Sequence, residues 1–289
     1  MYERGWRRYA ILALFLGPSL IGMLVFTVGP IVASFGLSFT NWDLLRPPRL
    51  VGASNYAAMM TDAEFWRTLR NTLTFLVGYI PLVITSGLLV AVLLNTRIPG
   101  MQIFRAMYFL PVVTSWVAVA LIWRWLFNPV YGLVNNLLGA IGISGPAWLF
   151  DPNWAMPAVI LTSVWKDTGF VMVILLAGLQ GIPREYYEAS SIDGANFVQR
   201  LRFITIPLLA PALVFALSIS LINSFQVFDQ VYVMTEGGPA GATMVLVERI
   251  VRNAFSYSRM GYASAMSWVL FALIFATSLT FYALKRWRS

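Results

Sequence analysis

The sequence predicts an all-α integral membrane protein with six transmembrane helices, and three observations support this fold class. Of the 289 residues, 59% are apolar and only 11% are charged, whereas an average soluble domain has about 25% charged residues. The apolar residues lie in long blocks, and about twenty residues are what an α-helix needs to cross the hydrocarbon of a bilayer. The basic residues fall unevenly between alternate connections, as they do in membrane-spanning proteins.

The six predicted spans are separated by connections of unequal length. A basic stretch precedes the first span, but its apolar run is about twice as long as that of a signal peptide and no A-x-A site closes it, so we expect it to be retained. The connection over 41–70 carries Trp42, Tyr56, Phe65 and Trp66 among charged residues, which is typical of a short helix at the membrane surface. The spans are expected at about 10–38, 71–94, 105–127, 155–179, 207–234 and 261–284.

The basic residues predict which side of the membrane each connection faces. An even number of spans places the termini, 1–9 and 285–289, on the same side. That side, which includes the 180–206 loop, carries eleven Lys and Arg residues, against seven in the longer connections opposite. Because basic residues accumulate in cytoplasmic connections, we predict that both termini and the 180–206 loop are cytoplasmic.

The residue types that are missing exclude several kinds of chemistry. The chain has no Cys and no His, which excludes thiol nucleophiles, imidazole bases and ordinary zinc sites. It has only two Lys, at positions 166 and 285, and neither lies in a GxxxxGK[ST] loop. We therefore expect no catalytic residues, no metal and no nucleotide site in this chain, so that any nucleotide is bound by a partner.

The loop over 180–206 predicts two short helices joined by a turn. Pro183 suits the first turn of a helix that continues to about Ile192. Asp193 is expected to be the N-cap of a second helix from Ala195 to about Phe203, and Gly194 to permit the turn between them. A side chain at Gly194 is expected to obstruct this turn.

Several polar residues lie inside the predicted spans, where an ionised group costs about 2.5 to 3.5 kcal/mol and usually faces a cavity or a partner. On span 5, Asn223, Gln226 and Gln230 fall within about 60° of one another on a helical wheel, with Asp229 at the margin. This stripe either lines a solute pathway or bonds to a neighbouring helix. The candidate pathway residues are Trp165, Lys166, Phe170, Asn223, Gln226, Asp229 and Gln230.

On span 4, Lys166 and Asp167 are about 100° apart, so each is expected to bond to another helix rather than to its neighbour. Arg124 lies between two tryptophans near the end of span 3, and is interpreted as reaching the aromatic belt at the membrane surface. Between spans 5 and 6, Gly237, Gly238 and Pro239 form a candidate contact loop for a binding protein.

The 180–206 loop resembles a known signature. Glu188-Ala189-Ser190, then Gly194, then Ile204 and Ile206-Pro207 at the same spacing, are similar to the EAA---G---------I-LP signature of permease subunits of bacterial ABC importers. Ser190 replaces Ala and Ile206 replaces Leu, each with little change in size. Further runs resemble the first permease of carbohydrate importers of the maltose and glycerol-3-phosphate type; among them are LSFTNWD at 37–43, RNT at 70–72, VWK at 164–166, AGLQ at 177–180, IDGA at 192–195, QVFDQ at 226–230 and GGP at 237–239.

This resemblance, which covers nearly the whole chain, implies the type I ABC importer permease fold and an assembly in a bacterial inner membrane. It implies a second permease, two ATPase subunits that bind ATP and Mg, an extracytoplasmic binding protein and a carbohydrate solute. It also implies that a coupling loop docks on an ATPase subunit, with the residues Glu188, Ala189, Ser190, Asp193, Gly194, Ala195, Ile204 and Pro207.

Two other functions compete with this interpretation. An ion-coupled secondary transporter would use Asp229 and Lys166 as a relay, but the spans show no detectable repeat and the loop carries the ATPase-docking signature. An intramembrane enzyme would have only Lys166 or carboxylates for catalysis. The sequence names neither the solute nor the permease that makes most of the solute contacts.

Overall fold

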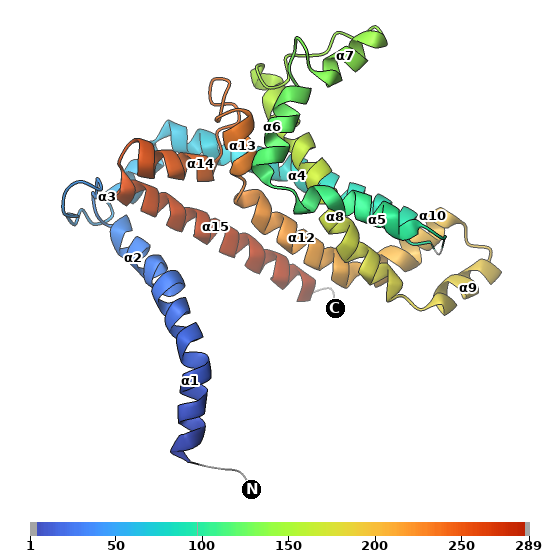
Figure 1. The fold of residues 1–289 in the computed structure, drawn as a ribbon, viewed down its shortest axis with the longest axis horizontal. Helices are drawn as coiled ribbons and strands as arrows, with labels where there is room; N and C mark the ends of the chain where they lie inside the picture. The colour runs from blue at the N-terminus through green and yellow to red at the C-terminus, as the bar shows by residue number, and fades with distance from the viewer. Residues whose placement is uncertain (1–4, 97, 287–289) are drawn as a thin grey trace. The chain divides into compact units, whose positions relative to one another are not determined.

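A computed structural model describes residues 5–96 and 98–286 (Figure 1). Arg4, Arg97 and Arg288, which contribute to the charge count, lie outside the described residues. Within the described part, the regular elements are helices, and the one β-bridge joins Thr40 to Leu50. Four of these helices are long and apolar enough to cross a membrane, or six spans if each of two bent helix pairs counts as one. The chain divides into two compact units.

The first unit contains residues up to Asp62 together with Ile250–Ala272. Its N-terminal helix runs through α1 (Trp6–Met23), a π-helical turn (Leu24–Val28) and α2 (Gly29–Ser38). The most apolar window of this helix has no buried residue, as expected for a surface that contacts lipid or another subunit. The unit also contains α3 (Ser54–Thr61), the π-helical turn Arg252–Ser256 and the first part of α15 (Met260–Arg286).

Hydrogen bonds between distant segments hold the first unit together. The Asn55 amide donates to the carbonyl oxygens of Ser38 and Thr40, at 2.8 Å each. The Tyr262 hydroxyl donates to Asp62 at 2.8 Å. The connection after α2 is thus fixed on α3 and on the start of α15 rather than free.

The second unit contains Ala63–Arg249 and the chain after Ala272. Its central element is α8, which contacts α4, α5, α12 and α13, and Figure 1 shows α8 running among them. Two-thirds of the most apolar window of α8 is buried, so its apolar residues are placed by contacts with other helices. The helices are α4 (Ala63–Leu94), α5 (Met101–Val113), α6 (Trp116–Leu126), α7 (Leu133–Ala140), α8 (Pro152–Gln180), α9 (Arg184–Ile192), α10 (Phe197–Arg200), α11 (Ile206–Leu208), α12 (Ala210–Phe225), α13 (Asp229–Met234) and α14 (Leu246–Val251), with a π-helical turn at Leu201–Thr205.

Helix α4 begins eight residues before the predicted start of span 2. Phe65 and Thr68 are buried and continue the three- and four-residue spacing of Phe75, Tyr79 and Val83, which is the period of one helix face. The expected surface helix over 41–70 is therefore limited to α3, and its last residues belong to α4.

Two spans that the sequence predicted as continuous helices are each broken in the structure. Span 3 is divided into α5 and α6, which meet at an angle of 97° around Thr114 and Ser115. Span 5 bends by 71° at Leu209 and ends at Phe225, so that Gln226–Phe228 separate α12 from α13. Hydropathy records only how apolar a segment is, and it cannot detect a break whose freed backbone groups are satisfied inside the protein.

Candidate functional site

Two adjoining cavities lie at the centre of the second unit. Their volumes are about 250 Å³ and 280 Å³, and they share four wall residues, Tyr79, Trp116, Asp167 and Asn223. Gln226, Asp229 and Gln230 also line the first cavity, and Lys166 and Phe170 also line the second. The structure thus brings six of the seven candidate pathway residues to one place.

The seventh candidate, Trp165, lines neither cavity. Its ring makes an edge contact with Trp123 at 5.5 Å between centroids, and nearly half of its side chain is exposed. Because Trp165 and Lys166 are neighbours on a helix, they point in directions about 100° apart. Trp165 is therefore a packing residue on α8.

Asn223, Gln226 and Gln230 do not lie on one continuous helix, so the helical-wheel prediction that placed them on one face was wrong. Gln226 is the C-cap of α12 and Gln230 lies in α13. Gln230 is buried and donates to Ser163 of α8 at 3.3 Å, whereas Asn223, Gln226 and Asp229 are exposed at the cavity wall. Gln230 thus bonds to a neighbouring helix, as one interpretation of the stripe expected, and the solute pathway remains a prediction for the exposed residues.

The two charged neighbours on α8 bond in different directions, as predicted. Asp167 accepts a hydrogen bond of 2.8 Å from the hydroxyl of Tyr79 on α4. The Lys166 ammonium donates to the carbonyl oxygens of Pro111 and Val112, at 3.0 and 3.1 Å. Arg124, expected in the aromatic belt, is exposed and donates to the Val233 carbonyl at 3.3 Å.

Sequence reasoning missed several cavity residues, and two of them, Tyr79 and Trp116, line both cavities. A signal existed for Tyr79, because a carboxyl group inside a span requires a donor and Tyr79 lies on an apolar span with few other donors. No signal existed for Trp116, because its position depends on the break between α5 and α6.

The coupling segment, residues 184–206, forms two helices joined at Gly194. The backbone of Gly194 has φ +74°, and no heavy atom lies within 4 Å of where a Cβ would be. The expectation that a side chain would obstruct this turn is therefore wrong. The left-handed backbone conformation, rather than crowding, restricts which residue types fit here.

The second helix of the coupling segment begins later than predicted. Asp193 is the C-cap of α9, and Asn196 is the N-cap of α10, with Gln199 completing a capping box. A capping box satisfies two amides at once, whereas Asp193 is followed by the residue that makes the turn. The helical chain after Asn196 then continues through the π-helical turn to Leu208, without ending near Phe203.

Contacts between its two arms give the coupling segment a fixed form. Tyr187 and Thr205 share a hydrogen bond of 3.0 Å between their hydroxyls, and Arg200 donates to the Ser191 hydroxyl at 3.1 Å. Ser190 is buried and Ile204 half-buried, whereas the remaining signature residues Glu188, Ala189, Asp193, Gly194 and Pro207 are exposed, with Ala195 half-buried. Exposed apolar side chains surround them, namely Tyr186, Ile192, Phe197, Val198 and Phe203.

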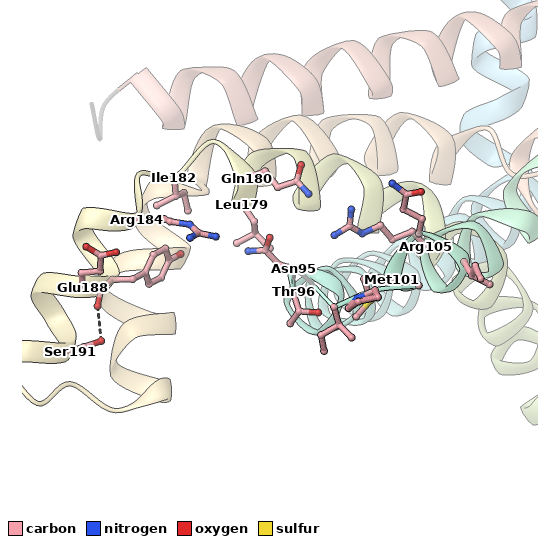
Figure 2. A pocket seen from close by; sticks show the side chains of 16 residues that line it. Asn95, Thr96, Met101, Arg105, Leu179, Gln180, Ile182, Arg184, Glu188 and Ser191 are labelled. Carbon is pink, nitrogen blue, oxygen red and sulfur yellow. Dashed lines mark hydrogen bonds between the residues drawn. The ribbon is translucent and has the colours of Figure 1, made fainter.

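A larger cavity of about 1250 Å³ lies beside the coupling segment. Figure 2 shows the side chains of Arg184 and Glu188 on one side of it and those of Asn95, Met101 and Arg105 on the other. The coupling segment therefore borders an open recess rather than packing directly on the start of α5.

The loop at 235–245 is held on α4. The Asn71 amide donates to the carbonyl oxygens of Gly241 and Met244, at 2.9 and 3.0 Å, and the Thr72 hydroxyl accepts from the Leu246 amide at 2.9 Å. The candidate binding-protein residues Gly237, Gly238 and Pro239 lie in this loop; Gly237 is buried and the other two are half-buried.

Among the described residues, no group of three or more acidic side chains is placed to hold a metal ion. Residues 83–288 match the family described as the binding-protein-dependent transport system inner membrane component. The chain belongs to this family. Its fold is that of the type I ABC importer permeases, and the predicted function as a permease subunit of an ABC importer is confirmed at this level.

Individual relatives agree with this assignment. The probable ABC transporter permease protein YesP of Bacillus subtilis (strain 168) is 41% identical, over 90% of this chain and 85% of the relative. The sulfoquinovosyl glycerol transport system permease protein SmoG of Agrobacterium fabrum is 37% identical, over 90% of this chain and 85% of the relative.

A solved structure supports the same fold. A bacterial alginate ABC transporter, in complex with an alginate pentasaccharide-bound periplasmic protein, contains a chain that matches this permease with a TM-score of 0.85 and 25% identity, covering 98% of each chain.

Proposed function

We propose that this permease forms, together with a second permease, an alternating-access pathway for a sugar or sugar-like solute. The observation that carries the proposal is the pair of polar cavities, into which Asn223, Gln226 and Asp229 are open. A sugar presents many hydroxyl groups, each both donor and acceptor, and amide and carboxylate groups match them. The solutes named for SmoG and for the alginate transporter support a sugar.

Two ATPase subunits are the proposed source of energy, and ATP and Mg bind to them. The coupling segment docks on one of these subunits, with the exposed apolar residues around Gly194 forming the contact. Its helices are held by local caps and by contacts between its arms, and such a segment can transmit the movement of a docked subunit to α8 and α12. The two termini of the chain and the coupling segment face the cytoplasm of the bacterium.

An extracytoplasmic binding protein delivers the solute on the opposite side. The loop at 235–245 is the proposed contact, with Glu236 and Ala240 as its exposed residues. Gly237, Gly238 and Pro239 would then shape the loop, and the bonds from Asn71 would hold it ready for docking.

Reconstitution tests the transport proposal. The chain would be purified with its second permease, ATPase subunits and binding protein, and placed in proteoliposomes with radiolabelled maltose, lactose, trehalose and sulfoquinovosyl glycerol as probes. We expect ATP-dependent uptake of at least one sugar. Uptake that follows an ion gradient without ATP would support a secondary transporter and overturn the proposal.

The same preparation tests the cavity. Asn223→Ala and Gln226→Ala should each lower uptake per assembled complex by about tenfold, which corresponds to one lost hydrogen bond of about 1.4 kcal/mol. Asn153→Ala, which removes an exposed amide distant from the cavity wall, is the control. A reduced yield of complex with unchanged uptake per complex would show that these amides only connect helices.

Cysteine labelling tests the orientation, because the chain has no native Cys. Ser191 and Ala240 are both exposed in the structure. A Cys at Ser191 should be protected from an impermeant thiol reagent added to intact cells, whereas a Cys at Ala240 should react. The reverse pattern would overturn the proposed orientation.

A further inference from the structure

The break between α5 and α6 interrupts the helical hydrogen bonds, and the Pro111 carbonyl accepts from the amide and hydroxyl of Thr114 instead. The last four carbonyls of any helix have no donor within the helix, and α5 ends at Val113 while α6 starts at Trp116 in a different direction. In the hydrocarbon region such carbonyls are costly unless the protein supplies donors. A donor from another element can therefore add to this local cap.

Lys166 of α8 is this donor. Its ammonium donates to the Pro111 and Val112 carbonyls, and only 3% of the residue is exposed. A positive charge at a helix C-terminus is also favoured by the helix dipole. Lys166 is thus occupied by backbone carbonyls, although it lies on the cavity wall and was expected to meet the solute.

The same cap fixes the position of an aromatic ring. The Lys166 ammonium lies 4.9 Å from the centroid of the Trp116 ring, within the range of a cation–π contact. Trp116 is the first residue of α6, is half-buried and lines both cavities. The break therefore places an indole ring on the wall of cavities that are also lined by the polar groups of Asn223 and Asp167.

We propose that Trp116 is the platform on which the sugar ring of the solute stacks, and that Lys166 is the residue that positions it. A pyranose has an apolar face of C–H groups and a rim of hydroxyls, so a flat aromatic ring beside amide and carboxylate groups matches both parts. This inference rests on the proposed transport of a sugar and names the residue that recognises its ring.

The test uses the reconstituted transporter at saturating binding protein, with the same four sugars as probes. Trp116→Leu should lower uptake per assembled complex by about tenfold, and Trp116→Phe by about twofold or less, because Phe keeps an aromatic face. Trp125→Leu, an exposed residue of the same helix, is the matched control and should behave as the unmodified chain. Equal uptake by the Trp116→Leu and Trp125→Leu variants would overturn the platform.

A double-mutant cycle tests the positioning role. If Lys166 acts through Trp116, adding Lys166→Met to Trp116→Leu should change uptake per complex by less than about twofold, although each single change lowers it strongly. Lys166→Arg, which keeps the charge and donors, should restore most of the uptake. If the losses of uptake from the two single changes multiplied in the double variant, Lys166 would act independently of the Trp116 ring, and the positioning role would be overturned.

Two further outcomes separate this inference from the proposed function. If the unmodified transporter takes up none of the sugars, the proposed solute class fails and the platform with it. If Trp116→Leu does not assemble, a Cys at Thr114, which lines the second cavity, gives a second measurement. A transported sugar should slow its alkylation by an uncharged maleimide, and an unchanged rate would overturn the platform.

Discussion

The coupling segment and the cavity wall each depend on a break between helices, and the two breaks are held in different ways. At Gly194 the turn is set by the backbone of the residue itself and by the adjacent capping box. Between α5 and α6 the break is capped by Lys166, which is 55 residues from Pro111 in the sequence. One break is therefore local and exposed, and the other depends on tertiary contacts.

Because of this difference, substitutions in the two regions should have different effects. Changes in the coupling segment alter residues that are mostly exposed, so they should affect partner docking more than folding. Changes at the α5–α8 contact alter the packing that holds the break, so they should affect folding first. Three substitutions test this distinction, beginning with the largest expected loss of stability.

The largest effect is expected at Gly169, where α8 approaches α5 closely. A Cβ on Gly169 would overlap the carbonyl oxygen of Tyr108, and small residues allow such close contacts between membrane helices. Gly169→Ala should lower the free energy of unfolding by about 1–3 kcal/mol, as overpacking does, and reduce the yield of complex. Thermal unfolding in detergent measures it, with Gly139→Ala as control because nothing lies within 4 Å of that position. Equal stability of both variants would contradict the close contact.

An intermediate effect is expected at Gly194. Gly194→Val should cost about 1–2 kcal/mol, because a β-branched residue disfavours positive φ, and should weaken copurification of the ATPase subunit while the permease remains inserted. Gly194→Asn is the matched control, since Asn adopts this conformation more easily. If both variants retained the ATPase equally, the turn would not be part of the docking surface.

The smallest effect on stability is expected at Glu188. It is exposed on α9, so Glu188→Gln should leave thermal unfolding of the permease unchanged. Binding-protein-stimulated ATP hydrolysis should nevertheless fall, because the proposed docking of the coupling segment places this carboxylate at the ATPase contact. Glu185→Gln, an exposed carboxylate on the same helix, should have less effect. Equal hydrolysis by the two variants would show that position 188 has no special role.

The same contrast explains what could be predicted from the sequence. The turn at Gly194 and the approximate positions of the spans follow from local composition and spacing. The N-cap of α10 does not follow from them, because Asp193 and Asn196 are both good caps and the choice depends on where the turn ends. The break before Trp116 could not be predicted, because part of its hydrogen bonding comes from Lys166 of a distant helix. Likewise, Gln230 and Gln226 are the same residue type and both line the first cavity, and only the packing of α13 on α8 buries Gln230 while Gln226 stays exposed.

The attachment of the 235–245 loop to α4 has a mechanical consequence. The two bonds that Asn71 donates to this loop, and the bond that Thr72 accepts from Leu246 directly after it, would have to break before the loop could shift along α4. Helix α4 has 32 residues, which corresponds to a rod of about 48 Å at 1.5 Å per residue. The chain directly after its far end, at Asn95, borders the recess beside the coupling segment. A tilt of this rod would therefore move both of its ends together, and with them Tyr79, which α4 places on the wall of both cavities.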